Sequence, residues 1–176
     1  MMIKGNTFFI LVLIVFVACS RLVPHPLNVT PVGALALFAG AYVSTRYAWA
    51  VPIAALLIGD AITGFYGVVS MFFVYTGFAC SVLLGYLFLH NKRSIGRLGG
   101  SVLTSSVTFY LLSNFGEWLV YYPHTFASLL QCYINGLPYL ERSMIANSLY
   151  TIVLFGLYEG VRYYWGRYEQ THVRTG

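Results

Sequence analysis

Charged side chains are scarce in this sequence of 176 residues, where they make up 9% of the chain against 59% for hydrophobic residues. A soluble domain carries roughly 25% charged residues, because its surface has to be wetted by water. The scarcity of charge therefore excludes a soluble globular domain, a disordered chain and a nucleic-acid-binding domain. With a mean hydropathy of +0.73, we expect an integral membrane protein in contact with the lipid bilayer.

Catalytic and nucleotide-binding motifs are absent too. The sequence contains no GxxxxGK[ST] pattern, and hence no ATP site of the P-loop type, and it contains neither HExxH nor GxSxG. No two carboxylates stand at helical spacing within an apolar run, as a proton relay requires. Three cysteines are an odd number, which argues against a disulfide framework. These absences favour a carrier or a substrate-binding membrane subunit.

The long apolar runs indicate the fold. A membrane-spanning helix needs about 20 apolar residues, so the length allows six spans. We predict one all-α transmembrane domain over residues 1–176, with six transmembrane helices at residues 7–23, 32–44, 49–63, 68–89, 98–115 and 143–164. The first is expected to be a retained helix and not a cleaved signal peptide. Residues 116–141 are expected to form an outer loop with an interfacial or re-entrant helix at 125–137, because this piece is short and Pro138 follows it.

The distribution of basic residues predicts the orientation. With the N-terminus inside, the inner segments hold eight of the ten Lys and Arg residues, namely Lys4, Arg46, Lys92, Arg93, Arg97, Arg162, Arg167 and Arg174. The outer segments hold the other two, Arg21 and Arg142. By the positive-inside rule both termini are expected to be cytoplasmic. Pairs of small residues, Ala36/Gly40 and Ala55/Gly59, are expected to let helices approach closely.

A few polar residues stand out against this apolar background. Asp60 is the only acidic residue inside the first five predicted spans. An ionisable group at membrane depth is either functional or satisfied by backbone amides at the Gly64–Gly67 turn, and both interpretations stand. His25 and Asn28 lie in an outer loop with three prolines and are open as ligand contacts. Trp118 belongs either to an interfacial aromatic belt or to the lid of a pocket.

Cys80 is the most specific feature. It lies about eleven residues from the outer end of the span at 68–89, hence ~16 Å deep. Gly77, one turn outward, puts no side chain beside the thiol, and we expect this to leave room for a bulky flat ligand. A lone membrane cysteine is most often a small apolar side chain. A thiol in an apolar site is hard to ionise, but a bound metal deprotonates it.

Several stretches of the sequence resemble a known family. They are residues 25–38 (HPLNVTPVGALALF), Gly59-Asp60 with Gly64-Phe65-Tyr66, Val74-Tyr75 before Cys80, and Tyr122-Pro123-His124-Thr125 with Cys132-Tyr133. With the six predicted spans, almost the whole chain is similar to the BtuM family, small predicted cobalamin transporters of Gram-negative bacteria. That family is related to the S-components of energy-coupling factor (ECF) transporters. Residues 25–38 are typical of a wider group, and Cys80 is the residue that points to cobalamin.

This resemblance implies an ECF S-component-like fold and a bound cobalamin (vitamin B12) whose cobalt is ligated by the Cys80 thiolate. A thiolate is a soft, strong donor that labilises the opposite axial ligand of cobalt. The resemblance therefore also implies that binding removes cyanide from cyanocobalamin, with Cys80 as the catalytic group. The expected contacts with the corrin amides and the nucleotide tail are His25, Asn28, Asp60, Tyr66, Tyr75, Asn114 and Trp118.

The resemblance also bears on partners. Many S-components carry an Ala-xxx-Ala face on the first helix, where the shared coupling protein docks. The first span here has no such pair, which argues against docking to an ECF coupling module and favours solitary uptake of cobalamin across the bacterial inner membrane. The protein is also expected to be a monomer. Three other functions remain open. A structural or assembly subunit without a small ligand would be colourless when purified. A carrier for another vitamin would bind its ligand unchanged after Cys80→Ala, and a membrane corrinoid-processing enzyme would turn over without transport.

Overall fold

The structure is a computed structural model that describes residues 4–20, 29–43, 45–91 and 93–173. Within these ranges the chain forms seven helices and no strand. The helices are α1 (Lys4–Ser20), α2 (Val32–Tyr42), α3 (Thr45–Ala48), α4 (Ala50–Thr63), α5 (Val68–Leu89), α6 (Ile95–Tyr121) and α7 (Phe126–Val173). The predicted all-helical class is confirmed, and α5 has the bounds predicted for the fourth span.

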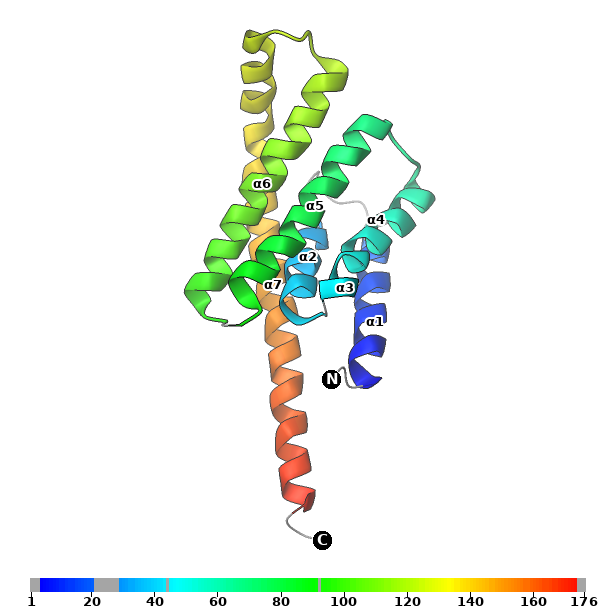
Figure 1. Cartoon of the computed structure of the whole chain (residues 1–176), viewed down its shortest axis with the longest axis vertical. Coiled ribbons are helices and arrows are strands. Elements are labelled where there is room, and N and C mark those ends of the chain that lie inside the picture. Colours follow the sequence, from blue (N-terminus) through cyan, green and yellow to red (C-terminus); the bar gives the residue numbers. More distant parts are fainter. Residues whose placement is uncertain (1–3, 21–28, 44, 92, 174–176) are drawn as a thin grey trace.

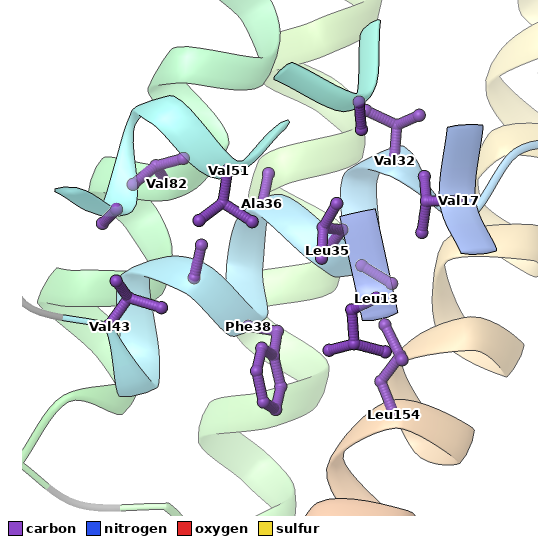
Figure 2. Close-up of a cluster of buried hydrophobic side chains, with 14 of the residues drawn as sticks. Leu13, Val17, Val32, Leu35, Ala36, Phe38, Val43, Val51, Val82 and Leu154 are labelled. Carbon is purple, nitrogen blue, oxygen red and sulfur yellow. The ribbon is translucent and has the colours of Figure 1, made fainter. Parts of the chain in front are cut away.

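Helix α2 occupies the centre of the molecule, where it packs against α4, α5 and α7 (Figure 1). Its residues 32–41 are all buried. A helix that is apolar on every side needs neighbours on every side, and the uniformly apolar sequence of α2 fits this position. Figure 2 shows the resulting core, in which Leu13 of α1 and Leu154 of α7 join Leu35 of α2 in one cluster.

The closest approach between helices occurs where α2 crosses α5. A Cβ atom added to Gly40 of α2 would overlap the Val82 carbonyl oxygen and lie 2.7 Å from the Tyr86 amide nitrogen. On the other side, a Cβ atom on Gly85 of α5 would lie 2.9 Å from the Leu37 Cα atom. Two glycines thus let the two backbones touch. Gly40 belongs to a pair predicted to permit such contact.

Helices α4 and α5 form a hairpin closed by a tight turn. Helix α4 ends at Gly64, whose φ of 103° lies in the left-handed region that glycine adopts without steric cost. The Gly64 amide donates a hydrogen bond to the Asp60 carbonyl oxygen at 2.9 Å. The turn at residues 64–67 therefore fixes how Asp60 on α4 faces the first half of α5.

Helix α7 corrects two predictions about the last third of the chain. We expected a separate interfacial piece at 125–137 and a span at 143–164, but Phe126–Val173 is one helix of 48 residues with Pro138 inside it. At 1.5 Å per residue this helix is about 72 Å long. Helix α6 is also longer than predicted and runs to Tyr121 instead of residue 115. The two helices form a hairpin that projects beyond the rest of the molecule (Figure 1).

Contacts with α6 explain why residues 126–137 continue the helix. A short isolated segment next to a proline forms a helix poorly, because nucleation is costly and proline removes one hydrogen bond. Here the Tyr110 hydroxyl of α6 donates to the Tyr133 carbonyl oxygen at 2.5 Å, and the Tyr133 hydroxyl donates to the Leu111 carbonyl oxygen at 2.9 Å. This pairing supplies the tertiary support that the local sequence lacks.

Two helices in the described part of the chain are long and apolar enough to cross a membrane, Val68–Leu89 and Phe126–Tyr164. Helices α2 and α4, with 11 and 14 residues, are shorter than the ~20 residues that a full crossing needs. The second and third predicted spans are therefore shorter elements that pack against the longer helices. Of the six predicted spans, those at 68–89 and 143–164 lie within helices that are long and apolar enough to cross a membrane.

Candidate functional site

Cys80 lies close to the middle of α5, twelve residues after Val68 and nine before Leu89. Its thiol is free and half-buried. The two other cysteines differ, since Cys19 is exposed, whereas Cys132 is buried and its sulfur donates to the Asn114 carbonyl oxygen at 3.3 Å. Cys80 is thus a free cysteine in the middle of an apolar helix whose surface the neighbouring helices do not cover completely.

The space expected beside Gly77 is filled. A Cβ atom at Gly77 would lie 2.9 Å from the Cδ2 atom of Phe109 on α6. The missing side chain therefore accommodates a neighbouring helix and leaves no room there for a flat ligand. Phe73 and Thr76 lie seven and four residues before Cys80 and share its face of α5. Both side chains are only partly buried, and the Phe73 ring packs against the Phe115 ring of α6.

Asp60 forms the most buried polar contact among the predicted site residues. Its side chain is 1% exposed, and its Oδ2 atom accepts a hydrogen bond from the Tyr75 hydroxyl at 2.7 Å. A buried carboxylate requires such partners, because removing its charge from water is costly. The fold therefore brings together Asp60 and Tyr75, which the resemblance had proposed separately as ligand contacts.

The other predicted contacts lie at different places. Tyr66 is 39% exposed in the turn between α4 and α5. Tyr75 and Cys80 are five residues apart on α5, which corresponds to a rotation of about 140°, so the Asp60–Tyr75 pair and the thiol occupy different faces of the helix. His25 and Asn28 lie outside the described residues.

Asn114 and Trp118 lie in the half of the α6–α7 hairpin that is nearer to its turn. The Trp118 indole nitrogen donates to the Ser128 hydroxyl at 3.0 Å. The Asn114 amide nitrogen donates to the Tyr110 carbonyl oxygen of its own helix at 2.8 Å. Gly136 of α7 packs directly against the Asn114 amide, since a Cβ atom there would lie 2.8 Å from its Cγ atom. Both residues thus help to hold the hairpin together.

A buried polar seam between α5, α6 and α7 escaped the sequence analysis. The Ser105 hydroxyl donates to the Ser81 hydroxyl at 2.8 Å, and the Asn147 amide nitrogen donates to the Ser106 hydroxyl at 3.2 Å. Ser101, Ser105 and Ser106 on α6 were a visible signal, because Ser101 and Ser105 are four residues apart and share a face of an apolar helix, and Ser106 adds a third polar group beside them.

A charged cluster at the other end of the bundle was missed as well. The Tyr42 hydroxyl donates to Glu159 Oε1 at 2.6 Å, and the Arg93 guanidinium lies 3.7 Å from the same oxygen and 4.1 Å from the centre of the Tyr42 ring. Arg162 approaches the second carboxylate oxygen of Glu159 at 3.9 Å. This cluster joins α2, the turn between α5 and α6, and α7. Glu159 is the only acidic residue in the last predicted span, and this isolated acid in an apolar run was the sequence signal for the cluster.

Within the described residues the protein is all-helical, with two helices long and apolar enough to cross a membrane and a free, half-buried cysteine in one of them. By sequence the chain belongs to a family of unknown function, DUF6580, whose model matches residues 2–170. No curated protein and no solved structure matched the chain.

Proposed function

We propose that this chain is an integral protein of the bacterial inner membrane. Large apolar side chains project outward from α5 and α7, among them Leu87, Ile152 and Leu157, which are 62%, 63% and 60% exposed. Polar side chains such as Ser81, Ser105 and Asn147 are buried between the same helices. An apolar exterior around a hydrogen-bonded polar interior suits lipid, because polar groups facing hydrocarbon are costly.

The distribution of basic residues supports an orientation of the protein in the membrane. The beginning of α1 and the turn between α5 and α6 lie on the side of the helix bundle from which the end of α7 projects (Figure 1). Arg93 and Arg97 at that turn, and Arg162 near the end of α7, are exposed. Under the positive-inside rule this side of the bundle faces the cytoplasm, together with both termini.

Within this membrane protein we propose a binding site for cobalamin with Cys80 at the cobalt. The observation that carries this proposal is the free, half-buried thiol near the middle of α5. Cobalt in cyanocobalamin is six-coordinate, so a protein ligand has to displace one axial ligand, and a thiolate is a suitably soft donor. The resemblance implies Asp60, Tyr75, Asn114 and Trp118 as contacts for the corrin amides. In the structure Asp60 and Tyr75 bond to each other on another face of α5, and Asn114 and Trp118 make hydrogen bonds within the α6–α7 hairpin.

The same chemistry accounts for removal of cyanide. The Cys80 thiol loses its proton, a cobalt–sulfur bond forms and the cobalt–carbon bond breaks. Cyanide leaves with its electron pair and takes up a proton, while cobalt remains in the +3 state. The exchange needs no external reductant. Cobalamin is thus the cargo of a solitary transporter, and decyanation accompanies its binding.

The experiment is an absorption spectrum. Wild-type protein and Cys80→Ala are purified in detergent, incubated with cyanocobalamin and freed of excess ligand. Wild-type protein is expected to retain a corrinoid with a shifted visible spectrum, and Cys80→Ala is expected to lose that shift. Cys132→Ala and Cys19→Ala are the matched controls, since each removes one thiol elsewhere, and both should keep it. The proposal fails if wild-type protein retains no pigment, or if Cys80→Ala gives the same shift.

A second assay separates transport from processing. Wild-type protein is placed in sealed vesicles, and radiolabelled cobalamin is added outside. Accumulation inside the vesicles supports a transporter. Release of cyanide without accumulation supports an enzyme that processes corrinoids in the membrane.

A further inference from the structure

An apolar groove runs along α7, and none of its lining residues is among the residues proposed to contact cobalamin. Its volume is about 340 Å³, and its lining residues are Val29, Arg142, Ile145, Ala146, Leu149, Tyr150 and Val153. Ala146, which is 3% exposed, forms the floor, while Ile145 and Leu149 are 55% and 59% exposed. The small side chain of Ala146 between the larger side chains of Ile145 and Leu149 thus forms a groove along the surface of the helix.

Arg142 is the only charged residue that lines this groove. Its guanidinium lies 5.8 Å from the centre of the Tyr139 ring. No hydrogen bond or ion pair engages Arg142 within the part of the chain that the structure describes. An arginine presents five N–H donors in a planar fork that matches a phosphate group. The groove is therefore apolar along its length and ready to bind an anion at one end.

The spacing of charges along α7 places Arg142 at a membrane surface. Arg142 and Arg162 are twenty residues apart on one helix, which corresponds to about 30 Å. The hydrocarbon core of a bilayer is also about 30 Å thick. If Arg162 lies at the cytoplasmic interface, Arg142 lies at the outer one, where lipid phosphates are found.

The length of the groove matches a single leaflet. From Arg142 to Val153 the helix rises about 16 Å, and one half of the hydrocarbon core is about 15 Å thick. An acyl chain that starts at the level of Arg142 and follows Leu149 to Val153 ends near the middle of the bilayer. The charge at Arg142, the apolar lining and the length of the groove thus all fit a phospholipid.

We propose that this groove binds a phospholipid of the outer leaflet, with its anionic headgroup at Arg142 and one acyl chain along Ile145, Leu149 and Val153. The proposal rests on the proposed insertion of the chain into a membrane. It does not depend on cobalamin, because none of the lining residues belongs to the proposed ligand contacts.

The test compares two lipids that differ in headgroup charge. Wild-type protein is reconstituted with equal amounts of phosphatidylglycerol and phosphatidylcholine that carry the same acyl chains, and native mass spectrometry counts the lipids retained. We expect wild-type protein to prefer phosphatidylglycerol and Arg142→Gln to lower that preference about fivefold, the effect of one basic residue at an anionic membrane surface. Arg162→Gln, which removes one charge at the other end of the same helix, is expected to change it less.

A second measurement needs no substitution and locates the acyl chain. Phosphatidylglycerol with a photoactivatable diazirine in its acyl chain is cross-linked to wild-type protein, and the modified peptides are identified by mass spectrometry. We expect labels within residues 142–153. Equal retention of the two lipids by wild-type protein, unchanged selectivity in Arg142→Gln, or labels confined to other segments would each overturn the inference.

An alkaline carbonate wash separates this inference from the proposed function. Protein released from membranes by the wash would refute membrane insertion, and both proposals would fall. Protein that stays in the membrane and shifts the corrinoid spectrum, but retains no phosphatidylglycerol at Arg142, would overturn the lipid site alone.

Discussion

At the α2–α5 crossing two glycines face the backbone of the opposite helix, whereas in the α6–α7 hairpin side chains reach across to backbone carbonyls. Gly40 and Gly85 bring helix backbones into contact. In the hairpin, the hydroxyl groups of Tyr110 and Tyr133 each bond a carbonyl oxygen of the other helix. The crossing thus depends on the absence of side chains, and the hairpin depends on particular ones.

This difference sets how each region responds to change. A backbone that blocks a new atom can move only if the whole helix moves, because protein interiors are close-packed. A side chain that blocks a new atom can rotate at a smaller cost. We therefore expect substitutions at the crossing to cost more than substitutions of similar size in the hairpin.

The largest effect is expected for Gly40→Ala. The added Cβ atom would overlap the Val82 carbonyl oxygen and press on the Tyr86 amide, so we expect a loss of about 3 kcal/mol, at the upper end for overpacking. Thermal unfolding in detergent measures this loss. Gly156→Ala on α7 is the matched control, because nothing lies within 4 Å of its added atom. Equal melting of Gly40→Ala and wild-type protein would refute the backbone contact.

A smaller effect is expected for Gly136→Ala in the hairpin. Here the obstacle is the Asn114 side chain, with its Cγ atom 2.8 Å from the added atom. Rotation of the amide breaks its bond to the Tyr110 carbonyl, and we expect a loss of about 1.5 kcal/mol. A double-mutant cycle sharpens the comparison, because Gly136→Ala should cost almost nothing in an Asn114→Ala background. An undiminished cost in that background would mean that backbone blocks this site too.

How far the sequence predicts the fold depends on whether the signal is local. The bounds of α5 and the turn at Gly64 follow from an uninterrupted apolar run and from glycine spacing, both readable over short distances. The continuity of α7 through Pro138 cannot be predicted from such local signals. The local rule that proline ends a helix gives the opposite result. The contacts that overcome it come from Tyr110, 28 residues earlier in the chain.

The candidate site follows the same division. The thiol at Cys80 and the buried acid at Asp60 were identifiable as unusual residues in apolar runs. The bond between Asp60 and Tyr75 requires the hairpin geometry, which no spacing rule provides. The interpretation of Gly77 was wrong because the residue that fills the space, Phe109, lies on another helix. A helix pattern tells which residues share a face but not what covers that face.

The next smaller effect tests single hydrogen bonds of the hairpin. Tyr133→Phe removes the donor to the Leu111 carbonyl oxygen, and a typical hydrogen bond contributes about 1 kcal/mol. We expect that loss in thermal unfolding, together with faster amide hydrogen exchange in residues 126–137. Tyr47→Phe on α3 is the control, since Tyr47 is 54% exposed and makes no hydrogen bond in the described part of the chain. Exchange that speeds up equally in α2 would contradict a local role.

The smallest effect is expected in the opposite direction, for Thr151→Val on α7. The Thr151 hydroxyl is 1% exposed and has no hydrogen-bond partner within the described residues. A buried polar group without a partner is destabilising, and valine has nearly the same shape without it, so we expect a gain of about 0.5 kcal/mol. Ser105→Ala is the counterpart, because it removes a buried hydroxyl that is bonded to Ser81, and it should reduce stability. If both variants lose stability in thermal unfolding, the Thr151 hydroxyl has a hydrogen-bond partner, and it belongs to the polar seam between α5, α6 and α7.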